Sequence, residues 1–147
     1  MSGSTTDPSV LQMRLVVEAE DFDEAVAFYR DSLGLREELS VAGEGGADVV
    51  ILDAGRATLE LINPAQKRYI DEVEVGRQVS RKIRVAFQVS DVGSETDRLV
   101  ASGADLIADP VETPWRSRNS RMEAPAGLQI TLFEEPKAED AAGTPTR

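Results

Sequence analysis

The chain has 147 residues and a formal net charge of −11, and it contains neither cysteine nor histidine. Its length suits one compact domain. The missing cysteines exclude disulfides and thiolate chemistry, and the missing histidines exclude an imidazole base or metal ligand. The negative charge disfavours nucleic acid and anionic membranes as partners. No apolar run approaches the roughly 20 residues that cross a bilayer, and the start of the chain is polar, so we expect a cytoplasmic protein.

The first half of the chain predicts one βαβββ unit. Residues 11–19 alternate apolar and polar side chains as a half-buried strand does, and Arg14 lies on the polar face. Residues 21–33 predict a helix, because apolar side chains recur at helical spacing until Gly34. Three further strands are predicted after this helix, over residues 35–41, 48–53 and 57–63.

The second half predicts the same order of elements after a linker. Residues 64–81 are polar and form that linker, with room for a short helix. A strand over residues 83–89 and a helix from Val92 to Gly103 follow. The remaining strands are predicted over residues 106–111, 117–123 and 128–134. Both ends of the chain, residues 1–10 and 136–147, are rich in small and polar residues and are expected to be disordered.

The two halves match at a nearly constant offset. Arg14 and Arg84 begin corresponding strands and are 84 − 14 = 70 residues apart. Glu60 and Thr131 lie in the last strands of the two units and are 131 − 60 = 71 residues apart. Such agreement over a half-chain indicates a duplicated module. Residues at matching positions in the two copies are therefore the best guide to a ligand site.

The stretch DFDEAVAFYRDSLGL at residues 21–35 resembles the vicinal oxygen chelate superfamily, as does DPVETPW at residues 109–115. This superfamily includes glyoxalases, bleomycin resistance proteins and extradiol dioxygenases. The resemblance covers residues 11–135 and implies a single α+β domain. In it, two βαβββ modules, at about residues 11–63 and 82–135, form a curved mixed sheet that encloses a cup.

The resemblance also implies where a metal would bind. In metal-dependent members each module supplies one ligand from its first strand and one from its fourth. The corresponding positions here are Arg14, Glu60, Arg84 and Thr131. Only Glu60 can bind a divalent cation, since a guanidinium stays protonated and has no free acceptor. We therefore expect no metal and no cofactor.

Two arginines and one glutamate in a cup leave more than one interpretation open. They predict an anion site, because an anionic ligand would compensate the buried positive charge. The alternative is a buried Arg-Glu-Arg triad whose charges pair only with one another.

Trp115 would stack on a planar ligand or simply cover the sheet. The basic residues 116–121 suit a solvated edge or a dimer surface, although Arg118 or its neighbour Arg121 is placed to reach the pocket.

The preferred hypothesis is a metal-independent protein that binds or sequesters a small anionic or aromatic molecule. Its ligand contacts would be Arg14, Glu60, Arg84, Trp115, Arg118 and Thr131. The alternative is an enzyme of the same superfamily, a lyase, isomerase or dioxygenase, with an atypical site around Glu60. By resemblance we also expect a homodimer, in which the cup is built within one chain or across two.

Overall fold

The structure is a computed structural model and describes residues 11–136. The described residues are α+β, as predicted, with strands in a two-stranded and a four-stranded sheet. The helices are α1 (Phe22–Val26), η1 (Ala27–Ser32), η2 (Glu44–Gly46), α2 (Pro64–Glu74), α3 (Val92–Ala101) and η3 (Pro125–Gly127). The strands are β1 (Arg36–Ala42), β2 (Asp48–Asp53), β3 (Val85–Gln88), β4 (Asp105–Glu112), β5 (Arg118–Ala124) and β6 (Leu128–Glu134).

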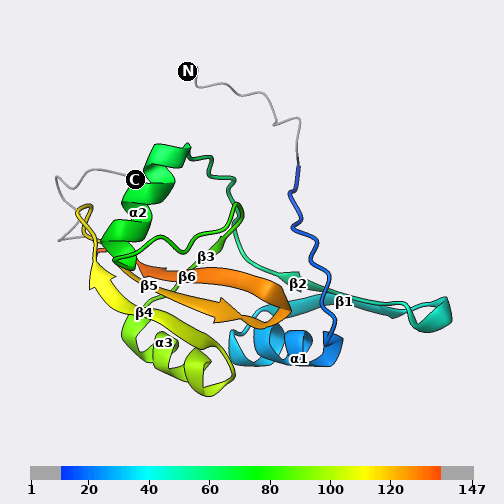
Figure 1. Cartoon of the computed structure of the whole chain (residues 1–147). Coiled ribbons are helices and arrows are strands. Elements are labelled where there is room, and N and C mark those ends of the chain that lie inside the picture. The colour runs from blue at the N-terminus through cyan, green and yellow to red at the C-terminus, as the bar shows by residue number, and fades with distance from the viewer. Residues whose placement is uncertain (1–10, 137–147) are drawn as a thin grey trace.

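The second module, residues 82–135, is a four-stranded sheet in the order β3-β6-β5-β4, with α3 against one face (Figure 1). Strand β3 runs parallel to β6, and β5 is antiparallel to both β6 and β4. Met122, Ile130 and Leu132 alternate toward α3 and are buried with Leu99. Asp91 caps α3 by accepting a hydrogen bond from the Ser94 amide at 3.2 Å. These elements lie where the sequence predicted them.

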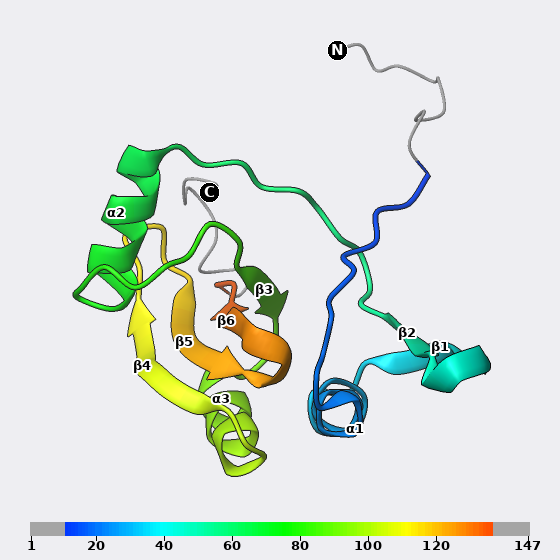
Figure 2. The same ribbon diagram turned by 45° about the vertical axis from the view of Figure 1, so that its right-hand side comes forward.

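The helix of the first module, residues 11–63, packs on the second module. Phe28 and Tyr29 are buried in the same cluster as Met122. The Tyr29 hydroxyl donates a hydrogen bond to the Pro125 carbonyl oxygen at 2.8 Å. The predicted helix is present, but it changes from α to π winding at Ala27. The antiparallel hairpin of β1 and β2 projects away from this helix (Figure 2), and β1 is exposed along its whole length.

Two predicted strands of the first module are absent from the structure. Residues 11–19 and 57–63 run as open chain without strand pairing. The turns of the two modules also differ. Ala126 and Gly127, between β5 and β6, have φ of 67° and 69°, whereas in the first module Gly55 has a φ of 73° and Arg56, the position that matches Gly127, has no positive φ.

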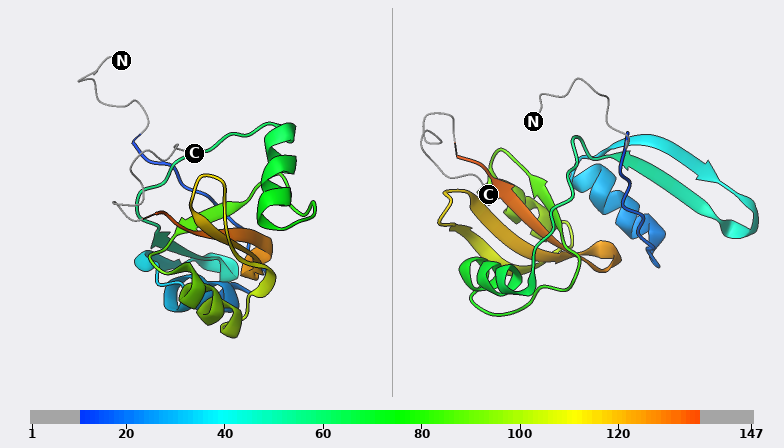
Figure 3. Two further views of the ribbon diagram at one scale, coloured as in Figure 1. Left: turned by 90° about the vertical axis from the view of Figure 1, so that its left-hand side faces the viewer. Right: turned by 90° about the horizontal axis from the view of Figure 1, so that it is seen from above.

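Helix α2 forms within the predicted linker. Asn63 caps it by accepting a hydrogen bond from the Gln66 amide at 2.9 Å, and Pro64 occupies its first turn. The helix lies over the face of the four-stranded sheet opposite to α3 (Figure 3). The linker is therefore part of the wall around that face.

The chain ends are the remaining part of the predicted organisation. Residues 1–10 and 137–147, nearly all of the predicted disordered ends, lie outside the described residues. Within residues 11–136 no helix has both the length and the apolar character to span a membrane.

Candidate functional site

The two faces of the second module's sheet are separated by the alternation of side chains along each strand. Ser120 of β5 faces α3, where its hydroxyl oxygen lies 2.8 Å from that of Thr96. The next residue, Arg121, faces α2 instead. We call this second side the cup face and define it by Arg84, Asn119, Arg121, Gln129 and Thr131.

Arg84 directly precedes the edge strand β3 and is half-buried. Its Nη1 donates a hydrogen bond to the Thr131 hydroxyl at 2.6 Å, the one bond of this side chain within the described residues. Burial lowers the pKa of the Arg84 guanidinium, and the nearby charge of Arg121 lowers it further. Three carboxylates near Arg84 act in the opposite direction, those of Glu74, Glu60 and Asp71. Arg84 therefore remains a cation with unused donors in a mixed field of charges.

Arg121 is fully buried and forms ion pairs with two carboxylates of α2. Its Nη1 lies 3.1 Å from Asp71 Oδ1, and its Nη2 lies 2.6 Å from Glu74 Oε1. Nη1 also donates to the side-chain oxygens of Ser80 and Gln129, at 3.0 and 2.9 Å. Arg121 Nε is buried and has no hydrogen-bond partner within residues 11–136. The α2 carboxylates thus pair with the two terminal nitrogens of Arg121 and leave its Nε without a hydrogen bond from the described residues.

Asp71 ties α2 to the chain segment that leads into β3. It accepts hydrogen bonds from the amides of Val79 and Ser80 at 2.9 and 2.8 Å, and from the Ser80 hydroxyl at 2.6 Å. Burial alone would raise the pKa of the Asp71 carboxyl, but the bonds from Ser80, Val79 and Arg121 lower it to about 2. Asp71 is therefore ionised in the folded protein at any ordinary pH.

The structure brings some of the predicted ligand contacts together. Arg84 and Thr131 are hydrogen-bonded, and the charge of Glu60 acts on Arg84 although Glu60 itself is exposed. Arg14 lies apart from them, exposed on the open chain before α1, where its Nη2 donates to the Gln12 side chain at 2.9 Å. Of the four predicted positions, Arg84 thus interacts with Thr131 and with the charge of Glu60, whereas Arg14 is bonded within its own segment.

Trp115 and Arg118 occupy different surroundings. The Trp115 ring is half-buried and tilts against Tyr69 of α2, with ring centroids 6.4 Å apart. Arg118 is exposed, and its charge acts on Asp91 at the start of α3. Arg118 therefore lies on the α3 side of the sheet, whereas Arg121, three residues later on the same strand, lies on the cup face.

The residues that build the cup face most directly were not all found from the sequence. Asp71 and Glu74 lie in the stretch predicted as a linker, and Asn119 was not singled out. Asn119 Nδ2 donates to Glu74 Oε2 at 2.7 Å and so completes the hydrogen bonding of that carboxylate. A signal was present: Asp71 and Glu74 are three residues apart and follow Ile70, which places all three on one side of a helix.

The residues present at the implied metal position do not suit a metal. Glu60 is one carboxylate close to the guanidinium of Arg84, and a cation held there would be repelled by that charge. Within residues 11–136 no group of three or more aspartates and glutamates is arranged to hold an ion.

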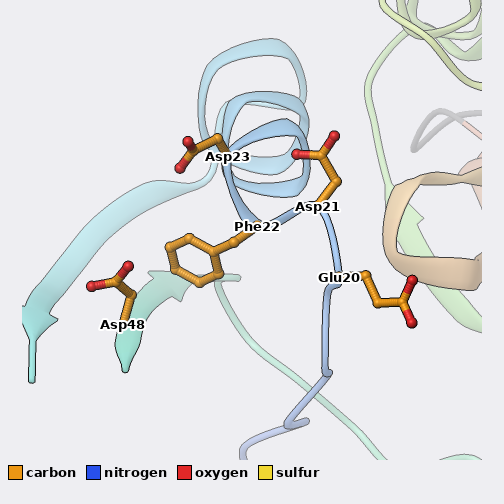
Figure 4. A pocket seen from close by; sticks show the side chains of 5 residues that line it. All are labelled: Glu20, Asp21, Phe22, Asp23 and Asp48. Carbon is orange, nitrogen blue, oxygen red and sulfur yellow. The ribbon is translucent and has the colours of Figure 1, made fainter. Parts of the chain in front are cut away.

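An acidic hollow lies elsewhere, between the start of α1 and β2 (Figure 4). In Figure 4 the carboxylates of Asp21 and Glu20 point away from those of Asp23 and Asp48. The hollow is open to solvent. One of them, Asp21, already caps α1 by accepting from the Glu24 amide at 3.1 Å. The lining residues are Glu20, Asp21, Phe22, Asp23 and Asp48. This hollow therefore has the character of a helix start and not of a ligand site.

Comparison with known proteins places this arrangement among relatives. A family model described as Glyoxalase-like domain matches residues 14–133. A glyoxalase/bleomycin resistance protein/dioxygenase from Nocardioides is similar in structure, with 19% identity, coverage of 97% of this chain and 92% of that one, and a TM-score of 0.53. A member of the same superfamily from Sphaerobacter thermophilus has 20% identity, coverage of 82% and 92%, and a TM-score of 0.54. Lactoylglutathione lyase from Agrobacterium tumefaciens has 26% identity, coverage of 87% and 95%, and a TM-score of 0.52. No curated protein is significantly similar to the chain.

Proposed function

The chain belongs to the family of glyoxalase-like domains, and from that premise we propose that it is a metal-independent protein that binds a small anionic molecule, preferably a planar one. The observation that carries the proposal is the state of Arg84. Its guanidinium is half-buried and forms one hydrogen bond within the described residues, to a neutral hydroxyl. A buried cation with free donors is stabilised by an anion, and a carboxylate accepts two of those donors at once.

Two features on the α2 side of the sheet favour a small ligand with a flat face. Thr131, fully buried beside Arg84, holds its guanidinium in place. The tilted rings of Tyr69 and Trp115 offer an aromatic surface at α2. Arg14 and Glu60 belong to the proposed ligand contacts as well, and both lie on open chain that is not fixed in either sheet. Arg118, which the sequence predicted as a ligand contact, lies on the α3 side of the sheet and is not among the contacts proposed here.

Benzoate, a planar carboxylate, is a suitable probe for calorimetric titration. The Arg84→Gln variant is expected to bind it at least about tenfold more weakly, since a charge-assisted pair is lost. Arg81→Gln is the matched control, because Arg81 is exposed and paired with Glu123 at 2.7 Å. Equal binding by both variants would contradict the proposal. Tight stoichiometric binding of Ni²⁺ or Zn²⁺ would contradict its metal-independent character.

The second candidate is an enzyme of the glyoxalase type. It is favoured by the 26% identity to lactoylglutathione lyase over 87% of this chain. In this candidate Glu60 would act as the base, because it is the one carboxylate among the four corresponding positions Arg14, Glu60, Arg84 and Thr131. Turnover of a thiohemiacetal or a catechol, lost in Glu60→Gln and kept in the exposed control Glu37→Gln, would favour this enzyme over the binding protein.

We also propose that the protein is a homodimer. Leu11, Val16, Leu59 and Leu61 are 72–87% exposed, and all four lie on the open-chain segments of the first module. These segments combine backbone groups that have no strand partner within residues 11–136 with large exposed apolar side chains. Such a surface is stabilised when another protein surface buries it. A second copy offers the same segments in return, as a two-fold symmetric contact does. Sedimentation velocity at micromolar concentration tests this, and a monomer there would contradict it.

A further inference from the structure

Helix α2 contacts the cup face largely through buried charged side chains. Three of its residues are buried, and two of them are carboxylates, Asp71 and Glu74; the third is Ile70. Its large ring, Tyr69, is 47% exposed. The buried contacts of α2 with the sheet are therefore mostly polar, and the ion pairs with Arg121 fix the position of the helix.

The two arginines of the cup face are compensated mainly by α2. Arg84 and Arg121 contribute two positive charges, and the buried carboxylates Asp71 and Glu74 contribute two negative ones, although Lys67 of the same helix also lies 3.8 Å from Asp71. Without α2 the sheet would present two guanidinium groups side by side, both able to bind an oxyanion. The helix carboxylates therefore occupy the position that the carboxylate of a ligand would take on Arg121.

The chain on either side of α2 permits the helix to move. Residues 57–63 before it are open chain, and residues 75–84 after it contain no helix or strand. Gly76, directly after the helix, has a φ of 85°, a conformation that glycine adopts without strain. Residues 78–80 are hydrogen-bonded to α2 through Asp71 and the Arg68 carbonyl, so they would move with the helix. This movement would break the contacts with Arg121, Asn119 and Gln129 and leave the strand pairing of the sheet intact.

We propose that α2 is an internal competitor for the anion site: Asp71 and Glu74 cover Arg121, and an anionic ligand displaces the helix to bind Arg121 together with Arg84. The inference rests on the proposed function, since it assigns a second arginine to the same site. It also names the ligand class more closely, as an oxyanion able to engage two guanidinium groups. The site is closed in the free protein and opens on binding.

Hydrogen exchange with mass spectrometry tests the displacement directly in the full-length protein. Saturating benzoate is expected to increase amide exchange in α2 while α3 is unchanged, because displaced helices exchange faster. Unchanged or slower exchange in α2, with benzoate bound, would overturn the displacement and leave the proposed anion site standing.

A variant tests the competition independently. Glu74→Gln is expected to bind benzoate about tenfold more tightly, because it weakens a charge-assisted bond of the helix and keeps an acceptor for folding. Glu72→Gln makes the same change on the exposed side of α2 and should leave the affinity nearly unchanged. Equal affinity in the two variants would overturn the competition. Absence of benzoate binding in the wild type and in Glu74→Gln would overturn both the competition and the proposed function.

Discussion

The guanidinium of Arg121 lies 2.6 Å from a carboxylate oxygen of Glu74, and both side chains are almost completely withdrawn from solvent. The pair joins the middle of β5 to the last turn of α2, and its two residues are 47 positions apart in the chain. A buried ion pair adds little net stability by itself, but loss of one partner leaves the other charge buried and uncompensated. The pair therefore fixes where α2 sits more than how stable the domain is.

Arg121→Met is expected to lower the free energy of unfolding by roughly 3–5 kcal/mol, because Asp71 and Glu74 would remain as buried charges. Urea denaturation followed by circular dichroism measures this. Arg118→Met is the control, since Arg118 is exposed on the same strand and its loss should change stability by less than about 0.5 kcal/mol. Equal stability of the two variants would mean that α2 does not depend on Arg121.

The ionised carboxylate of Asp71 is expected to make the folded protein less stable in acid. Its pKa falls from 3.8 to about 2 on folding, so the unfolded chain takes up a proton first as the pH drops. The carboxylate contributes about 2 kcal/mol above pH 4, and this contribution disappears between about pH 4 and pH 2. Urea unfolding at a series of pH values should show a smaller acid loss in Asp71→Asn than in the wild type. Parallel pH profiles for the two proteins would contradict this.

The second module shows how far the sequence alone leads. Alternation between apolar and polar residues predicts β6, because Leu128, Ile130 and Leu132 share one face and must pack on a helix to be buried. Asp91 predicts the start of α3 in the same way, through a bond to an amide three residues on. Both signals are local, and the structure of the second module confirms both.

The first module shows where that reasoning stops. Residues 11–19 and 57–63 have the side-chain pattern of strands, but a strand also needs a neighbour for its backbone, and the pattern does not provide one. The cup face is limited in the same way. Arg118 and Arg121 look alike in the sequence, and only the docking of Glu74 from a distant helix makes Arg121 the buried one.

Tyr29 gives a prediction about the contact between the modules. Burial raises the pKa of its hydroxyl well above the ordinary value, and the charge of Glu123 raises it further. Because the unfolded chain loses this proton first, Tyr29 should reduce stability as the pH rises above about 10. Tyr29→Phe removes the bond to Pro125 and should cost about 1 kcal/mol at neutral pH.

The absorbance of tyrosinate during alkaline titration measures this directly, since Tyr29 and Tyr69 are the two tyrosines of the chain. One of the two should resist ionisation until the protein unfolds, and that resistant group should be missing in Tyr29→Phe. Ionisation of both tyrosines at the ordinary pH in the folded protein would place the Tyr29 hydroxyl in solvent and contradict its bond to Pro125.

Leu61→Glu is expected to convert the proposed homodimer into a monomer. Leu61 is 84% exposed in the structure, so a charge there has no cost within a single chain, whereas burial of that charge at a contact between chains would be unfavourable. The melting temperature of the isolated chain should therefore change little while the sedimentation coefficient falls. Leu106→Glu is the control, because Leu106 is also exposed but lies on β4 of the second module. If Leu61→Glu remained dimeric, the open-chain segments of the first module would not form the dimer interface. Leu59 and Leu61 would then have to be buried by other residues of their own chain.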